Sequence, residues 1–308
     1  MTRLSFAALI VCSALPLLCC AQKIEGTLRS IVDGQPVPYA LVMDLSSPGN
    51  ATTTDTLGRF SLAVGGVVQG KQILISALAF RDTLVPVQYF SGKPGSEVLL
   101  EEQPVHLSEV RVGRGSGRGK SVRYGKTSYS LQRNTKGAIT GYPAATSGFF
   151  NGVVIVPAKS HYGTLLTKLS VYITPERNPS NPFLVRFLSC TRPLEHSKGF
   201  PAEYFIDMCT TPIIFKADKP GWNTVNIRAE NIRVPSNPFV VTLIPLGNTA
   251  PEGPHGVVPA HGAVLGQYDR LKVSNMFVAL RLGYYYGIAD AKSQKVPAIV
   301  LEGEKFKE

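Results

Sequence analysis

The stretch NATTTDTLGRFSLAV, residues 50–64, joins a turn signal to a strand signal and decides the first part of the fold. Apolar and polar residues alternate over residues 60–64, so alternate side chains share one face of an extended strand. Before this strand, Asp55 can accept a hydrogen bond from the backbone N–H two residues on, and Gly58 can adopt a positive φ. We therefore expect Asp55 and Gly58 to form a tight turn.

A ligand-binding role for Asp55 is the alternative interpretation. A calcium loop needs several further oxygen ligands at close spacing, and this stretch lacks the repeated acidic residues of such a loop. Asn50-Ala51-Thr52 has the pattern of an N-glycosylation acceptor, although so short a pattern also arises by chance. The residue types favour a structural role for Asp55.

Short strands on both sides of this stretch predict an all-β first domain. KIEGTLRS (residues 23–30) reads as a strand, and a turn at Asp33-Gly34 leads to another over residues 39–45. KQILISALAF (residues 71–80) is an almost continuous apolar run, which is typical of a central strand buried on both faces. We expect about seven strands up to residue 112, forming a compact antiparallel sandwich.

Residues 141–308 predict a second β-domain. Its apolar runs are short, rich in β-branched and aromatic residues and separated by proline-rich segments, without helical periodicity. In PFLVRFLSC (residues 182–190) both alternating faces are apolar, with Arg186 as the only charged residue. We expect a jelly-roll-like β-sandwich.

The positive charge is concentrated between these blocks. Residues 111–136 contain eight Lys and Arg and no Asp or Glu, whereas the whole chain has a net charge of +11. With its Gly and Ser, the segment 113–140 predicts a flexible linker. The alternative is a basic strip that contacts anionic outer-membrane glycolipid or acidic polysaccharide. Charge confined to one segment does not indicate a nucleic-acid-binding fold, so we expect no nucleic acid partner.

The N-terminus predicts export. Residues 1–21 combine Arg3, a short apolar run and small residues before a cleavage site at Gln22, which is typical of a signal peptide. The alternative is a lipid anchor on Cys20, but Cys19 occupies a position where a lipobox has Gly, Ala or Ser. We expect a protein of the periplasm or outer-membrane surface, without a transmembrane span.

Cleavage would leave two cysteines, Cys190 and Cys209. Disulfides persist in an exported compartment, so we expect these two residues to form one. The alternative is two buried free thiols that pack as small hydrophobic groups.

Residues 23–112 resemble the carboxypeptidase regulatory-like domain, a transthyretin-like β-sandwich. The resemblance rests on Asp33-Gly34, on PVPYA (residues 36–40), on TDTLGRF (residues 54–60) and on the exit LSEVRV (residues 107–112), a segment that follows this domain in TonB-dependent outer-membrane receptors. It implies an accessory domain of an exported envelope protein. It does not imply peptidase activity, because this domain accompanies carboxypeptidases without being their catalytic part, and none of the five histidines stands in an HExxH motif.

We identify no catalytic constellation, no metal ligands and no cofactor motif. Trp222, Tyr284 and Tyr286 are candidates for a sugar-stacking platform, with core or edge packing as the alternative. The predicted organisation is a signal peptide (1–21), a regulatory-like sandwich (22–112), a basic linker (113–140) and a second sandwich (141–308).

These features predict a non-enzymatic binding or structural module of the bacterial cell envelope. Its expected partner is a cell-surface glycan or an outer-membrane component. The alternatives are a carbohydrate-active hydrolase with an accessory sandwich, and an accessory component of an outer-membrane nutrient receptor.

Overall fold

The computed structural model describes the two β-rich blocks and parts of the chain between them. The described residues are 22–47, 50–65, 69–92, 95–103, 105, 119–128, 131, 133, 135–136, 141–143, 145–146, 149–175, 182–192, 199–246, 264–266, 268, 276–282, 285–288 and 296–306. The expected signal peptide, the alternative anchor at Cys20 and the exit segment 107–112 lie outside them.

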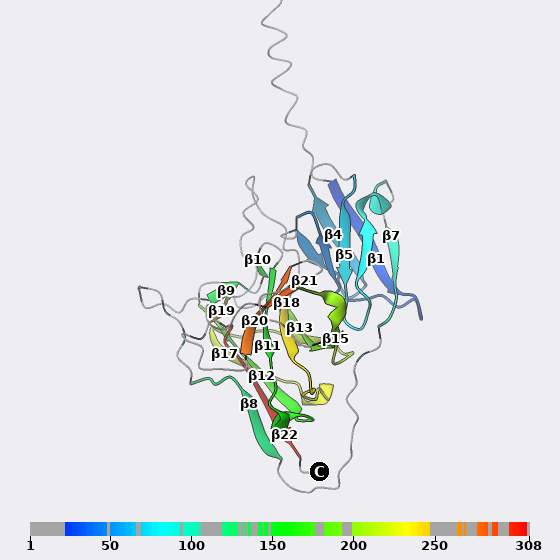
Figure 1. Cartoon of the computed structure of the whole chain (residues 1–308). Helices are drawn as coiled ribbons and strands as arrows, with labels where there is room; N and C mark the ends of the chain where they lie inside the picture. The colour runs from blue at the N-terminus through cyan, green and yellow to red at the C-terminus, as the bar shows by residue number, and fades with distance from the viewer. Residues whose placement is uncertain are drawn as a thin grey trace, which may run out of the picture.

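The fold is all-β, as expected, and within the described residues the helical segments are short 3-10 turns (Figure 1). None of those turns has the length and apolar character needed to cross a membrane. The first domain contains β1 (Gln22–Ser30), β2 (Leu41–Asp44), β3 (Ala51–Thr53), β4 (Arg59–Val64), β5 (Gln72–Ser76), β6 (Thr83–Pro86), η2 (Val87–Phe90) and β7 (Ser96–Leu100).

The second domain contains more and shorter elements. They are β8 (Lys120–Tyr124), β9 (Gly141–Pro143), β10 (Ala145–Thr146), β11 (Phe149–Ile155), η3 (Lys159–His161), β12 (Leu165–Ile173), β13 (Phe183–Cys190), β14 (Gly199–Pro201), η4 (Ala202–Tyr204), β15 (Phe205–Asp207), β16 (Ile213–Phe215), β17 (Gly221–Asn226), η5 (Arg228–Glu230), β18 (Phe239–Pro245), β19 (Val264–Gly266), β20 (Met276–Leu282), β21 (Tyr285–Ile288) and β22 (Ile299–Lys305).

Two sheets, in the orders β4-β1-β7 and β3-β2-β5-β6, form the first domain. The alternation predicted for residues 60–64 is present, because Phe60, Leu62 and Val64 are buried in the core between these sheets. One pairing differs from the expected antiparallel arrangement: β1 and β7 run parallel. Between β6 and β7 the chain crosses from one sheet to the other through η2, so β7 reaches β1 in the same direction.

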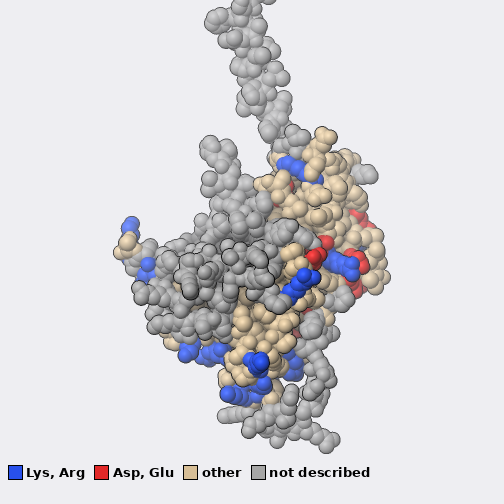
Figure 2. All heavy atoms as spheres, viewed as in Figure 1, with Lys and Arg blue, Asp and Glu red and all other residues tan. Residues whose placement is uncertain are grey.

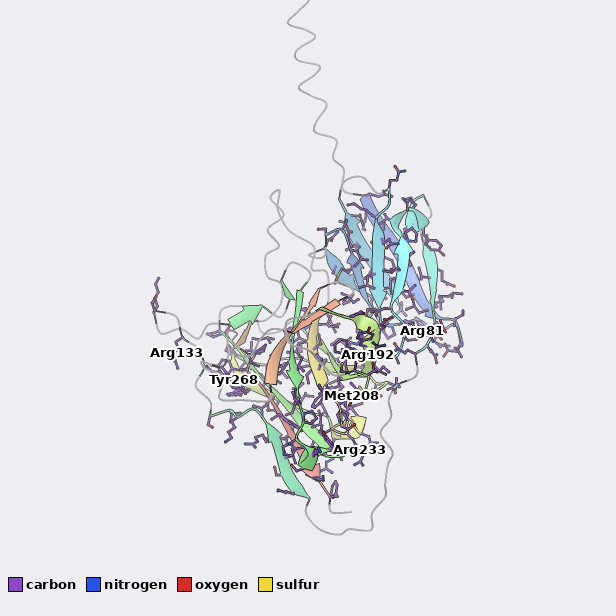
Figure 3. The ribbon with its side chains drawn as sticks, viewed as in Figure 1. Arg81, Arg133, Arg192, Met208, Arg233 and Tyr268 are labelled. Carbon is purple, nitrogen blue, oxygen red and sulfur yellow. The ribbon has the colours of Figure 1, made fainter. Side chains whose placement is uncertain are left out.

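The second domain is likewise built from two sheets. One has the order β14-β21-β20-β11-β18-β13-β15, and the other has the order β8-β22-β12-β19-β9. Short strands extend them, since β10 pairs with β11, β16 with β13 and β17 with β12. The domain has its own hydrophobic core, to which Met208 and Tyr268 contribute from inside the domain (Figure 3).

The prediction that residues 113–140 form a flexible linker is wrong for residues 120–124. Residues 120–124 form β8, which pairs antiparallel with β22 and adds an edge strand to the second domain. Val122 and Tyr124 are buried in that domain's core, although Arg123 between them is charged. Two apolar residues at alternate positions therefore suffice to dock this basic segment as a strand.

Candidate functional site

The two domains meet through strands that are buried on both faces. On β2, Val42 points into the first core, whereas Leu41 and Met43 point away from it and join a separate cluster at the junction. Leu184 of β13 and Ile244 of β18 complete this cluster from the second domain. In Figure 1 the first domain, in blue and cyan, stands beside one end of the second. The junction is therefore a packed apolar interface.

A buried ion pair lies in the same interface. Arg186 on β13 binds Asp207 on β15 through two hydrogen bonds, Nε to Oδ1 at 3.0 Å and Nη2 to Oδ2 at 2.7 Å. Their side chains are only 6% and 5% exposed. Bidentate geometry of this kind makes a strong charge-assisted contact, and it satisfies much of the hydrogen-bonding capacity of both buried groups.

Both members of this pair also bind the first domain. Arg186 donates to the hydroxyl of Ser76 at 3.0 Å and to the carbonyl of Ala77 at 3.3 Å. Asp207 accepts a hydrogen bond from the backbone N–H of Ala79 at 3.0 Å. The ion pair of the second domain therefore holds the end of β5 and the turn that follows it.

Backbone strain also occurs at the junction. Among the described residues three non-glycine residues have positive φ, and two of them, Tyr39 (58°) and Ala79 (64°), contact the partner domain. This conformation is unfavourable for residues with a Cβ atom, and it persists only where the surroundings enforce it. At Ala79 it accompanies an N–H directed at Asp207. A strained backbone that is held by a specific contact indicates that the two domains are docked in a defined orientation.

An open groove of about 950 Å³ runs along this junction. Its wall on the first domain includes Glu25, Arg59, Phe60 and the threonine-rich segment 52–56. The second domain contributes Pro182, Ile214 and Leu246. The groove thus exists because the two domains are docked, and one of its walls is apolar whereas the other carries hydroxyl groups.

The charges of the groove are largely compensated. Asp55 and Arg59 form an ion pair with Nε and Oδ2 3.0 Å apart, and Glu25 lies 2.6 Å from the ammonium of Lys23. The Thr54 hydroxyl is used internally, donating to Val37 and accepting from Ala40. By contrast, Thr27, Thr56 and Ser61 line the groove with partly or fully exposed side chains. These properties suit an uncharged ligand that has both hydroxyl groups and apolar faces.

Asp55 forms the turn expected from the sequence. Its Oδ1 accepts hydrogen bonds from the backbone N–H of Leu57 at 2.9 Å and of Arg59 at 2.8 Å, and Gly58 has φ of 72°. The N–H of Arg59 lowers the pKa of Asp55 below its usual value; burial opposes this effect, and the guanidinium of Arg59 adds to it. Asn50 of the sequon is buried and donates to the carbonyl of Ala63, so the folded chain does not present it.

The aromatic platform is not assembled by the described residues. Trp222 lies on β17 and packs edge-on against Tyr172, with ring centroids 5.5 Å apart, at the margin of the second core. Tyr284 lies outside the described residues, and for Tyr286 the structure describes the backbone of β21 but no side chain. β17 and β21 belong to different sheets. Trp222 thus packs at the edge of the core, which was the alternative to a role in sugar stacking.

The expected disulfide between Cys190 and Cys209 is wrong, because both residues are buried free thiols. The strand register explains the difference. Cys190 pairs with Phe205, which lies four residues before Cys209. Four residues of extended chain span about 13 Å, whereas the Cα atoms of a disulfide lie within about 7 Å. Each thiol instead contacts a carbonyl two residues further along the chain, and burial raises the pKa of both.

Sequence reasoning missed the junction residues Arg186 and Asp207, although one signal was visible. Arg186 interrupts a run that is apolar on both alternating faces. A charge at such a position must either face solvent or find a buried partner. The partner, however, lies 21 residues away and could not be identified from spacing.

No group of His, Cys, Asp and Glu among the described residues is arranged to hold a metal ion. Comparison of the sequence with protein-family models and with curated proteins gave no match.

Proposed function

We propose that the protein is a non-enzymatic binding module of the bacterial cell envelope, and that the junction groove binds an uncharged segment of a cell-surface glycan. The observation that carries this proposal is the lining of the groove, which combines Thr and Ser hydroxyls with Tyr39, Ile214 and Leu246. A pyranose ring likewise has apolar faces bordered by hydroxyls, and its binding sites combine apolar surface with a few polar groups. The resemblance of residues 23–112 to an accessory domain of exported proteins supports the envelope assignment.

The rigid junction supports the same proposal. A groove between mobile domains would have to be ordered when a ligand binds, which weakens affinity. Here the buried pair of Arg186 and Asp207 and the apolar cluster fix both walls in advance. The groove is therefore preformed for a ligand that lies across the two domains.

A glycan array probed with residues 22–308 tests the proposal, followed by calorimetry on any ligand found. Ile214→Arg places a long charged side chain in the groove, and we expect it to weaken binding at least tenfold. Val156→Arg is the matched control, because Val156 is similarly exposed (39% against 37%) but does not line the groove. Equal binding by Ile214→Arg and the wild-type protein would show that the groove is not the site.

A hydrolase remains the alternative, because two carboxylates, Glu25 and Asp55, line the groove. Paired carboxylates are the usual catalytic groups of glycosidases. Product analysis of any glycan bound in the array separates the two functions. Intact glycan after long incubation supports a binding module, whereas shortened products would overturn the non-enzymatic proposal.

A further inference from the structure

Two lysines stand directly opposite each other at the end of the β8–β22 ladder, beyond the core of the second domain. In the β8–β22 ladder, Tyr124 pairs with Leu301, and Lys120 pairs with Lys305. Because Tyr124 and Leu301 face the core, the strand period of two places Lys120 and Lys305 on the same inner face, beyond the last core residue. Like charges placed directly opposite each other destabilise a sheet.

The 3-10 turn η3 contacts this end of the β8–β22 ladder and brings His161 to it. Lys305 donates to the carbonyl of Ser160 at 2.9 Å, which holds its ammonium against the turn. His161 lies beside Tyr124, with Nδ1 and the phenol oxygen 3.2 Å apart. Burial lowers the pKa of His161, and the positive charges of Lys120 and Lys305 lower it further. The contact of Lys305 with Ser160, that of His161 with Tyr124 and the pairing of Lys120 with Lys305 place these three groups at the same end of the β8–β22 ladder.

The acidic groups of this region are already engaged. On the outer face of β22, Glu302 pairs with Arg123, and Glu304 pairs with Arg228 at 2.6 Å. Within the part of the chain that the structure describes, no carboxylate lies at ion-pair distance from Lys120 or Lys305. Figure 2 shows Lys and Arg gathered over the end of the molecule where β8 and β22 lie in Figure 1.

Protection of a sheet edge does not account for this arrangement. Lysines on edge strands discourage pairing with other chains, and Lys120 on the edge strand β8 could serve that purpose. Lys305, however, belongs to β22, which has β8 on one side and β12 on the other. A repulsive pair with one member on an inner strand is better explained by an anion that the two lysines share.

We propose that Lys120, Lys305 and His161 form a binding site for a phosphate group. Lysine is a common phosphate ligand that acts as a point charge, and two ammonium groups match the charge of a phosphate dianion. The ring nitrogen of His161 that does not face Tyr124 supplies a third polar contact. The site is independent of the junction groove and of the glycan proposed for it.

Titration of residues 22–308 with inorganic phosphate, followed by calorimetry and by the NMR signals of His161, tests this site. We expect saturable binding that moves the His161 signals, and weakening of about tenfold or more in Lys120→Gln and in Lys305→Gln. Lys216→Gln is the matched control, because it removes one exposed lysine beside β16, in the other sheet. Absence of saturable binding, or equal weakening by Lys216→Gln, would overturn the proposal.

Thermal unfolding provides a second measurement on the same variants. If the two lysines repel each other, Lys120→Gln and Lys305→Gln should unfold at the same temperature as the wild-type protein or at a higher one. At the same concentration, phosphate should raise the unfolding temperature of the wild-type protein more than that of either variant. Destabilised variants with unaltered phosphate binding would assign the lysines a structural role and exclude the site.

The source of the phosphate is distinguished with lipid vesicles. Vesicles of phosphatidylcholine alone and of phosphatidylcholine with phosphatidylglycerol are compared by sedimentation at fixed ionic strength. Binding to the anionic vesicles that free phosphate displaces assigns the site to lipid headgroups. Binding of free phosphate without binding of vesicles assigns it to a soluble phosphate compound. Vesicle binding that both Gln variants retain would contradict the proposed site.

Discussion

Strands β4 and β13 belong to the same kind of fold but differ in their burial. In β4, Phe60, Leu62 and Val64 are buried, and the residues between them are exposed or half-buried. In β13 every side chain is buried, including that of Arg186. A sheet of a two-layer sandwich usually has one wet face. The complete burial of β13 therefore requires a third layer, which is the sheet of the first domain that contains β2 and β5.

The two domains also differ in their net charge. The described part of the first domain, residues 22–105, contains five Lys or Arg and eight Asp or Glu. The described part of residues 119–306 contains fifteen Lys or Arg and six Asp or Glu. Nevertheless, the contact between the domains is made by an apolar cluster and one internally neutralised ion pair. Attraction between the net charges is thus not needed to explain the docking, which we expect to depend little on salt.

Removal of Arg186 should have the largest effect. Arg186→Leu leaves Asp207 buried without its cation, and loss of one partner of a buried pair usually costs about 3–5 kcal/mol. We expect that loss in the free energy of unfolding by guanidinium, together with separate unfolding of the two domains. The double variant Arg186→Leu, Asp207→Leu should recover part of the loss, because no charge stays unpaired. A loss below about 1 kcal/mol for the single variant would show that the pair does not hold the junction.

Truncation of Leu184 tests the apolar part of the junction. Leu184→Ala should lower the free energy of unfolding by about 2–3 kcal/mol, the lower part of the usual range, because two docked domains can partly close a cavity. Leu169→Ala is the matched control. Leu169 is also buried in the core of the second domain, but it lies on β12, in the sheet that does not contain β13. Hydrogen exchange distinguishes the two variants. Amides of β2 should exchange faster in Leu184→Ala than in Leu169→Ala, and the reverse order would contradict docking through β13.

Asp55→Ala should have a smaller and local effect. It removes two hydrogen bonds to backbone N–H groups at an exposed turn, and we expect a loss of about 1 kcal/mol confined to the first domain. Because the pKa of Asp55 is lowered by folding, its contribution is present above the unfolded value of about 3.8 and is lost as pH falls through the lower folded value. Asp55→Asn should reduce the acid dependence of unfolding in that window, and an unchanged pH profile would contradict this assignment.

Local features of the fold could be predicted from the sequence, and long-range features could not. The turn at Asp55 depends on hydrogen bonds spanning four residues, so its residue types identify it. The burial of residues 73–76 of KQILISALAF on both faces could also be predicted, but not that the second domain contacts the end of this strand. The disulfide and the linker were predicted wrongly for one reason: strand register places Cys209 four residues beyond Phe205, the partner of Cys190, and places Lys120–Tyr124 beside β22. Register depends on partners distant in sequence.

The smallest expected effect is an increase in stability, and it tests the backbone strain at the junction. At Ala79, with φ of 64°, a Cβ atom is unfavourable by about 1–2 kcal/mol, and Gly removes that penalty. Gly also increases the entropy of the unfolded chain, which offsets about 0.5–1 kcal/mol of the gain. We therefore expect Ala79→Gly to stabilise the protein by less than about 1 kcal/mol while the hydrogen bond to Asp207 is kept. Ala63→Gly, at an exposed position of β4 where φ is not positive, should instead destabilise it by a similar amount, since only the entropic effect operates there. Unfolding by urea measures both variants, and destabilisation by both would show that the junction does not enforce a strained backbone at Ala79.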